Sequence, residues 1–420
     1  MKVGMIGLGK LGLPCLLAME KHGGHEVYGF DVSSEVCSDI SNRSVSYWEA
    51  GVNEYLSDSS ITLVDSPEEL VRICDLIFVA VQTPHDPMFE GSSLVPESRK
   101  DFDYGYLESV ITSISAGLLA HPDDNPLIVV ISTVLPGTMS NRVLPALASA
   151  RSDFRFAYNP YFIAMGTTIS DFLNPEFLLI GGNSEKDSLD LASFYKFIHS
   201  ETKMMKIESA ELTKVAYNTF IGFKIVFANA LAEIVESRGG DVDEVTSALA
   251  DANYRIMSGA YMRAGMGDGG GCHPRDQIAM SWLAKEIDMS VDIFEFIAKA
   301  RDSQTERQAD LIISECKKHN LSPVLLGISY KPNSPLDIGS PARLLESILI
   351  AKGFKPQVID PWVFPNATFP TNSPHVYFIS SRHDAFFDLS NLVDSIVIDP
   401  WAIVKSIGSG SVLLTPGRPA

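Results

Sequence analysis

The chain has 420 residues, of which 45% are hydrophobic and 20% are charged, and its formal net charge is -19. This length exceeds one ordinary domain and predicts two or three domains with separate cores. The acidic balance argues against a surface that binds nucleic acid or anionic membranes, and no apolar run is expected to reach the roughly 18 residues that span a bilayer. Five scattered cysteines without metal-ligand spacing predict free thiols, no metal site and a cytoplasmic protein.

Strand and helix patterns alternate in the first part of the chain. Five apolar runs have the composition of buried strands: 2–6, 26–30, 76–81, 127–132 and 177–180. Continuous Val/Ile/Leu runs separated by helical segments are typical of a parallel sheet that is covered on both faces. The polar stretch 85–103 is predicted to be an extended loop.

A helical region and a second α/β region follow. The segment 209–238 has helical periodicity without proline, and shorter helices are predicted at 242–252 and 276–288. Further strands and one helix are then predicted: strands at 324–328, 355–360, 376–379 and 395–398, and a helix at 341–352. The tail from Leu414 is predicted to be disordered.

The first predicted strand leads into a G-x-G-x-x-G motif formed by Gly7, Gly9 and Gly12. The first glycine permits a tight turn, the second lets the backbone approach a pyrophosphate, and the third allows a helix to pack closely on the strand. The next predicted strand ends at Asp31, where an acid accepts the ribose hydroxyls and repels a 2′-phosphate. An accidental glycine turn would not require this strand, helix and acid, so the motif predicts NAD binding.

The segment 265–276 reads GMGDGGGCHPRD and places Cys272 at the end of a glycine-rich loop, before a helix that starts near Pro274. Backbone amides and a helix N-terminus favour a thiolate at such a position. Asp276 is expected about one helical turn further on. The other four cysteines are predicted to be packing residues.

Lys214 and Asn218 are four residues apart and share one face of the predicted helix 209–238. A lysine inside this largely apolar helix must be paired or face a site, because an unpaired buried ammonium is costly. From the residues alone, an exposed or snorkelling lysine remains the alternative.

Taken together, the motifs resemble the UDP-glucose/GDP-mannose dehydrogenase family nearly end to end. The matching segments are GLGKLG (7–12), VQTP (81–84), STVLPGT (132–138), the Lys214/Asn218 helix, GMGDGGGCHPRD (265–276) and LLGISYKPNSPLDIGSPA (325–342). The resemblance implies an α/β fold with two Rossmann-like, doubly wound parallel-sheet domains. Residues 1–205 would bind NAD, residues 301–420 the nucleotide of the substrate, and the all-helical region 206–300 would form a homodimer through its long helix.

The resemblance also implies two successive oxidations of the primary alcohol of a nucleotide-activated hexose, with a UDP-sugar favoured. Cys272 would attack the intermediate aldehyde, and oxidation of the thiohemiacetal would give a thioester and then a uronate. Lys214 and Asn218 would stabilise the oxyanion, while Asp276 would position Lys214 and a water. The implied cofactor contacts are Gly7, Gly9, Leu11, Gly12, Asp31, Thr83, Pro84 and Thr133, the last also holding a water. The implied substrate contacts are Tyr161, Lys214, Asn218, Arg255, Tyr261, Gly269, Lys331 and Arg343.

Two stretches depart from the family pattern. The family usually reads N-P-E-F with a second acid four residues after the first, whereas this chain has Tyr161 and Met165 at those positions. Tyr161 has the chemistry to donate a hydrogen bond, but a phenol is a poor general base at neutral pH. The arginine expected after Lys331-Pro332 is also missing, and Arg343 is the candidate to replace its charge.

These departures leave alternatives open. One is a two-electron oxidation that stops at the aldehyde, or a slow thioester hydrolysis, because the family glutamate is Tyr161. Another is a non-catalytic protein that binds NAD or a nucleotide sugar, although such a protein needs none of Cys272, Lys214, Asn218 and Asp276 as a set. A hydroxyacid dehydrogenase would need neither Cys272 nor a second α/β domain. The sugar, the nucleotide base and the polysaccharide pathway stay open.

Overall fold

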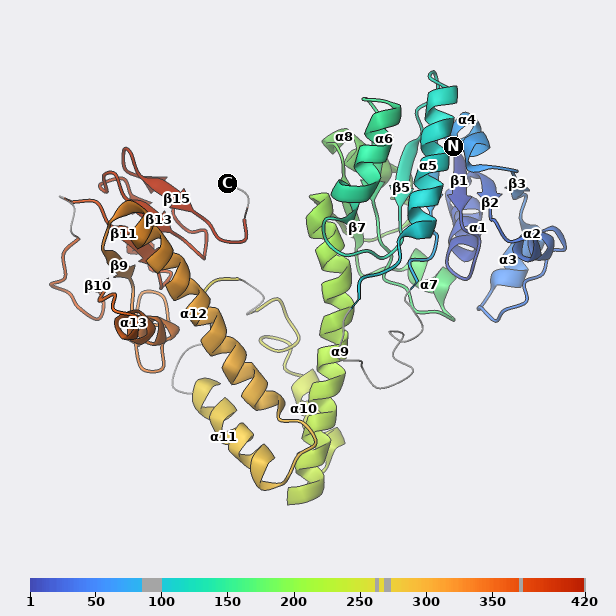
Figure 1. Ribbon diagram of the computed structural model, residues 1–420. Coiled ribbons are helices and arrows are strands. Elements are labelled where there is room, and N and C mark those ends of the chain that lie inside the picture. The colour runs from blue at the N-terminus through green and yellow to red at the C-terminus, as the bar shows by residue number, and fades with distance from the viewer. Residues whose placement is uncertain (85–99, 261–263, 268–272, 370–372, 419–420) are drawn as a thin grey trace. The chain divides into compact units, whose positions relative to one another are not determined.

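The computed structural model describes residues 1–84, 100–260, 264–267, 273–369 and 373–418 (Figure 1). The chain forms two compact units, Met1–Gly222 and Phe223–Ala420, and each is described by itself. The predicted loop 85–103 lies mostly outside the described residues.

The N-terminal unit is built on an eight-stranded sheet with the strand order β3-β2-β1-β4-β5-β6-β7-β8. The strands are β1 (Lys2–Ile6), β2 (Glu26–Phe30), β3 (Thr62–Leu63), β4 (Leu76–Val79), β5 (Leu127–Val130), β6 (Arg155–Tyr158), β7 (Leu178–Gly182) and β8 (Thr202–Met205). The five predicted strands are confirmed, with ends shifted by up to two residues. Strands β6 and β7 pair antiparallel, and the other neighbouring strands pair parallel. The sequence pattern missed β3, β6 and β8, which lack long apolar runs.

Helices cover both faces of this sheet and enclose two cores. Side chains of one face pack against α1, α3, α7 and α8, and those of the other face pack against α4, α5 and α6. The helices of this unit are α1 (Gly12–Gly23), α2 (Ser34–Ser41), α3 (Val52–Asp58), α4 (Pro67–Ile73), α5 (Gly105–Ala120), α6 (Leu144–Ala150), α7 (Thr168–Leu173) and α8 (Glu185–Phe194). This arrangement confirms the predicted doubly wound fold.

Helix α9 (Ile207–Arg238) is a single continuous helix, as predicted (Figure 1). Its later part packs against α11 (His273–Glu286) and the start of α12 (Ile293–His319) in the C-terminal unit. The predicted helix at 242–252 is α10 (Val242–Ala250), whereas α12 was not predicted. By length and composition alone, Ile207–Val235 is apolar enough to cross a membrane. The expectation that no apolar run is long enough to span a bilayer is therefore wrong for this helix.

A five-stranded parallel sheet with the order β10-β9-β11-β13-β15 forms the second α/β region. Its strands are β9 (Pro323–Leu326), β10 (Gln357–Ile359), β11 (Val376–Ile379), β13 (Ile396–Ile398) and β15 (Val412–Leu414), with β12 (Asp388–Leu389) and β14 (Ser406–Ile407) forming a separate pair. Helices α12 and α13 (Pro341–Ala351) cover one face. The predicted disorder from Leu414 is wrong: Leu414 pairs with Ile398, and Arg418 donates a 2.8 Å hydrogen bond to the Pro400 carbonyl.

Candidate active site

The turn after β1 has the shape that a dinucleotide pyrophosphate requires. Gly7 has a φ of 92°, and a Cβ on it would lie 2.9 Å from the Ala80 carbonyl oxygen. A Cβ on Gly12, where α1 begins, would lie 1.9 Å from the Gly7 oxygen, so both positions exclude larger residues. At Gly9 a Cβ would meet no atom within 4 Å, which leaves open space beside the N-terminus of α1. These residues fit NAD as a cofactor.

Asp31 lies directly after β2, at the same edge of the sheet. One carboxylate oxygen accepts the Leu8 backbone N–H at 2.7 Å, and the other accepts the Ser33 N–H at 2.9 Å. The side chain is only partly buried. Because a carboxylate has about four acceptor positions, the two backbone bonds leave capacity for the ribose hydroxyls.

The loops after β4 and β5 are joined beside this turn. The Thr83 hydroxyl donates to the Thr133 carbonyl at 2.7 Å, and the Ser132 hydroxyl donates to the Val81 carbonyl at 2.6 Å. Parallel neighbouring strands end at one edge of a sheet, so both threonines lie at the edge that carries the Gly7 turn. Leu11 precedes α1 at its N-cap position, and Pro84 immediately precedes residues 85–99, which are not described.

Lys214 is buried at the start of α9, with 7% of its surface exposed. Its ammonium donates a 2.7 Å hydrogen bond to the Tyr161 backbone carbonyl and lies 5.0 Å from the centroid of the Phe162 ring. Burial lowers the pKa of Lys214. This burial excludes the alternative of an exposed lysine. Asn218, one turn later on the same helix, is exposed.

Glu211 fixes the beginning of α9 to the loop after β5, a role that the sequence analysis missed. Its carboxylate is fully buried and accepts the backbone N–H groups of Gly137, at 2.6 Å, and Met139, at 2.8 Å. Burial raises the pKa of Glu211, although these two bonds act in the opposite direction. Because Lys214 follows three residues later on the same helix, these two bonds also fix the position of the lysine relative to the loop that carries Thr133. In the sequence, an acidic residue within a largely apolar helix indicates such a buried, hydrogen-bonded carboxylate.

Tyr161, at the position of the family glutamate, turns its side chain into the core. Its hydroxyl forms a 2.8 Å hydrogen bond with that of Tyr195, which donates to the Asn159 side-chain oxygen at 2.6 Å. The ring also packs edge-on against Phe172. Burial raises the pKa of Tyr161 well above its usual value, so the phenol stays neutral. Tyr161 therefore offers its carbonyl to Lys214, and the placement of its hydroxyl does not favour a hydrogen bond to substrate.

Replacing Tyr161 by phenylalanine is expected to lower the free energy of unfolding by about 1 kcal/mol, the usual net contribution of one hydrogen bond. Both kcat and KM should change by less than about twofold, because the carbonyl that holds Lys214 is retained. Urea unfolding and steady-state rates check this. As a comparison, Tyr195→Phe should be more destabilising, because it removes two bonds. A loss of turnover in Tyr161→Phe at unchanged stability would contradict the inward placement.

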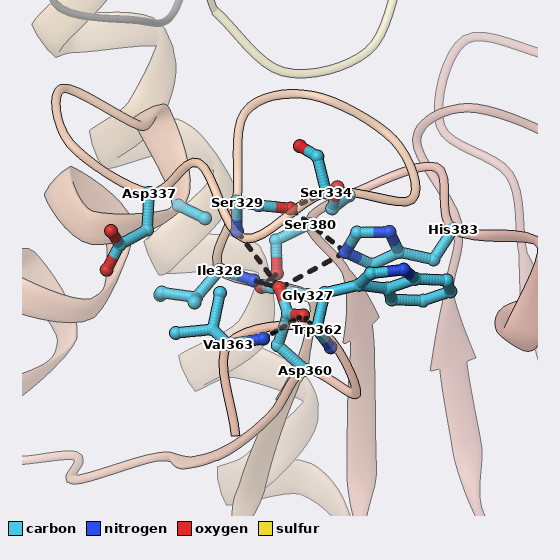
Figure 2. Close-up of polar contacts among 12 residues, drawn as sticks. Gly327, Ile328, Ser329, Ser334, Asp337, Asp360, Trp362, Val363, Ser380 and His383 are labelled. Carbon is cyan, nitrogen blue, oxygen red and sulfur yellow. Dashed lines mark hydrogen bonds and ion pairs between the residues drawn. The ribbon is translucent and has the colours of Figure 1, made fainter. Parts of the chain in front are cut away.

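The C-terminal unit repeats the turn geometry of the N-terminal unit at the end of β9 (Figure 2). Gly327 also has a φ of 92°, and its N–H donates to the Ile359 carbonyl at 2.7 Å. The next N–H, from Ile328, donates to the Asp360 carboxylate at 2.8 Å. Gly7, Leu8 and the acid after β2 make the same two contacts in the N-terminal unit. The two α/β regions therefore share this local fold.

Asp360 nevertheless differs from the acid after β2. It is fully buried, and besides the Ile328 N–H it accepts backbone N–H groups from Ser329 at 3.1 Å, Trp362 at 2.9 Å and Val363 at 3.1 Å. The His383 ring nitrogen Nε2 lies 3.1 Å from the same carboxylate. Burial alone would raise the pKa of Asp360, but these hydrogen bonds hold it well below its usual range. Donors of the protein itself therefore take up the acceptor positions of this carboxylate.

The remaining predicted substrate residues lie in the C-terminal unit. Lys331 is exposed in the loop after β9, and Arg255 is exposed in the turns after α10. Arg343 forms ion pairs with Asp337, at 3.1 Å, and Glu346, at 3.0 Å, so its guanidinium is already paired within the protein. Asp276 lies in α11, but its side chain is not among the described ones. Three predicted residues lie outside the described part of the chain: Tyr261, Gly269 and Cys272.

Comparisons with known proteins agree with this arrangement. Residues 1–199 match the NAD binding domain of the UDP-glucose/GDP-mannose dehydrogenase family, and residues 208–303 match its central domain. The chain is 30% identical to GDP-mannose 6-dehydrogenase of Pseudomonas syringae pv. syringae over 370 residues, covering 86% of this chain and 81% of the relative. It is 27% identical to UDP-glucose 6-dehydrogenase of Rickettsia conorii, covering 97% and 91%.

A solved GDP-mannose dehydrogenase from Pseudomonas aeruginosa superposes with a TM-score of 0.86 at 25% identity, covering 97% of this chain and 99% of that chain. The matched domains and relatives identify NAD as the cofactor and show an NAD-dependent nucleotide-sugar 6-dehydrogenase. The chain belongs to the UDP-glucose/GDP-mannose dehydrogenase family.

Proposed function

We propose that this protein oxidises the primary alcohol of a GDP- or UDP-activated hexose to the uronate through a covalent Cys272 intermediate. One observation supports it most strongly: a buried Lys214 ammonium is held by a backbone carbonyl in the unit that carries the Gly7 turn. A fixed positive charge of this kind stabilises an alkoxide or oxyanion as it forms. Asn218, one turn along α9, would add a neutral donor on the same side.

The chemistry proceeds in two oxidations. Two molecules of NAD, bound one after the other, would supply the oxidant, each accepting one hydride. Loss of a proton and a hydride converts the alcohol to an aldehyde, and the Cys272 thiolate then adds to the aldehyde carbon. Loss of the second hydride from this adduct gives a thioester, which water cleaves to the carboxylate with return of the thiolate. Lys214 would stabilise the negative oxygen of both the alkoxide and the adduct.

The last step lacks the acid that the family places at position 161. The Tyr161 hydroxyl lies in the core, and Met165, at the second acidic position, is 61% exposed and apolar. We therefore propose that thioester cleavage is the slow step of this enzyme. The alternative, an oxidation that stops at the aldehyde, rests on the same observation.

Counting NADH distinguishes these outcomes. GDP-mannose and UDP-glucose, the substrates in the relatives' names, are each supplied to the native protein and to Cys272→Ala, and NADH and product are measured per nucleotide sugar consumed. The proposal predicts two NADH and a uronate for the native protein, with no uronate from Cys272→Ala. One NADH with aldehyde would favour the alternative, and NAD binding without any turnover would favour a non-catalytic binding protein.

We also propose that the protein is a homodimer through α9. Five large apolar side chains on this helix are each at least 42% exposed: Phe220, Ile221, Phe223, Ile225 and Val226. These side chains point to several sides of the helix, and a helix that is apolar on all sides is usually buried against other helices. Light scattering without detergent should give twice the chain mass, and Ile225→Glu should give the monomer. Recovery of the native protein only with membranes would contradict the dimer.

A further inference from the structure

The loop that follows β9 is folded into a compact turn around the Lys331 main chain. The Lys331 carbonyl accepts the Ser329 hydroxyl at 3.2 Å and the Ser334 hydroxyl at 2.8 Å. The Tyr330 N–H closes the turn on the Leu336 carbonyl at 2.9 Å. The Lys331 side chain remains exposed. The turn 329–336 therefore fixes the point from which this side chain projects.

His383 holds the turn from beneath (Figure 2). It is fully buried, and its Nδ1 accepts the Asn333 backbone N–H at 2.7 Å. Because Nδ1 is an acceptor, the ring proton of the neutral imidazole lies on Nε2. Nε2 faces the Asp360 carboxylate at 3.1 Å and the Ser329 hydroxyl at 3.0 Å. The ring thus links the strand-end acid to the turn through one defined tautomer.

Two further contacts keep this link in one geometry. The Trp362 ring stacks on the His383 ring with a centroid distance of 4.4 Å and an interplanar angle of 20°. Asn333, which adopts a left-handed φ of 54°, exchanges hydrogen bonds with Asp384: its amide donates to the carboxylate at 3.0 Å, and its carbonyl oxygen accepts the Asp384 N–H at 3.1 Å. Asparagine tolerates this conformation better than most residues. The turn is therefore fastened at Asn333.

We propose that His383 is a positioning residue for nucleotide-sugar binding: through Asn333 it fixes the 329–336 turn and hence the place of Lys331. The role of Lys331 toward the substrate's phosphates rests on the proposed function. A turn that is already ordered before the ligand arrives binds more tightly, since no loop has to be immobilised on binding. His383 is buried beneath the turn, so it acts through the turn and without touching substrate.

Two near-isosteric substitutions separate the two ring nitrogens. In His383→Asn, the side-chain oxygen takes the place of Nδ1 and keeps an acceptor for the Asn333 N–H. In His383→Gln, the side-chain amide takes the place of Nε2–H and keeps the donor to Asp360, but the Asn333 N–H loses its acceptor. We expect His383→Gln to raise the KM for nucleotide sugar about tenfold and His383→Asn to change it less than about threefold. The KM for NAD and kcat should stay within about twofold in both variants.

Measurements on the native protein without substrate test the His383–Asn333 contact independently of activity. Nitrogen-15 NMR of labelled histidine should show an unprotonated Nδ1 and a protonated Nε2 for His383. The Asn333 amide should exchange with solvent slowly in the native protein and in His383→Asn, and at least about tenfold faster in His383→Gln. The opposite tautomer, or equal exchange in the two variants, would overturn the claim that His383 orders the turn through Asn333.

The kinetic result tests the link to substrate. An unchanged nucleotide-sugar KM in His383→Gln, together with faster Asn333 exchange, would overturn the positioning role. Failure of the proposed function would look different, because the native protein itself would then fail to turn over nucleotide sugars. In that case the exchange and tautomer measurements still decide whether His383 orders the turn.

Discussion

Replacing Lys214 by methionine is expected to lower kcat/KM for the nucleotide sugar by about 10²–10³, the usual loss when one oxyanion donor is removed. Methionine keeps an unbranched side chain of similar size, so the helix and the Phe162 contact should be retained. The free energy of unfolding should stay equal or rise slightly, because a buried ammonium is costly to desolvate. Steady-state kinetics and urea unfolding on the same preparations measure both quantities.

Lys206→Met is the matched control, since Lys206 directly precedes the same helix and is exposed. It should leave activity unchanged. The pH profile adds a second check. Because burial lowers the pKa of Lys214, the native enzyme should lose activity as the pH rises through that lowered value, when the ammonium becomes neutral. The residual activity of Lys214→Met should lack this alkaline loss. Equal activity of Lys214→Met and native protein would show that the ammonium does not act on the reacting oxygen.

Local patterns were sufficient to predict the cofactor edge of the N-terminal unit. Strands β1, β2, β4 and β5 are read from continuous apolar runs, and the Gly7 turn and Asp31 each follow directly after a strand. In a parallel sheet the carboxyl ends of neighbouring strands meet at one edge, so the order of elements alone brings these residues together. The Lys214 helix was predictable for a similar reason, because helical periodicity is local.

The direction of the Tyr161 side chain was not predictable from such patterns. Its hydroxyl is fixed by Tyr195, which lies 34 residues further along the chain in a different element. The same holds for His383, whose partners Asn333 and Asp360 are 50 and 23 residues away. No periodicity connects residues at such separations, so only the folded chain shows which polar groups share a bond.

Asp31 and Asp360 occupy the same place after a strand but differ in burial, so the same substitution should have different effects on stability. Asp360→Asn is expected to destabilise the C-terminal unit by about 3 kcal/mol, because the carboxamide presents an NH2 group to buried N–H donors that then lack an acceptor. Hydrogen exchange of the β9, β10 and β11 amides measures this unit specifically. Asp31→Asn is the matched control: it has the same place after β2, but it is partly exposed and accepts only two backbone bonds, so its loss should be about 1 kcal/mol.

The pH dependence of the Asp360 effect has a definite sign. Because the folded pKa lies below the value of about 3.9 for an unfolded aspartate, its stabilisation is complete above that value and is lost as the pH falls toward the folded pKa. The difference between native protein and Asp360→Asn should therefore be constant from pH 5 to neutral and shrink below about pH 4. A difference that grew in acid would mean that the carboxyl is protonated in the folded protein. Some of the hydrogen bonds from His383 and the backbone would then be absent, because a neutral carboxyl cannot accept all of them.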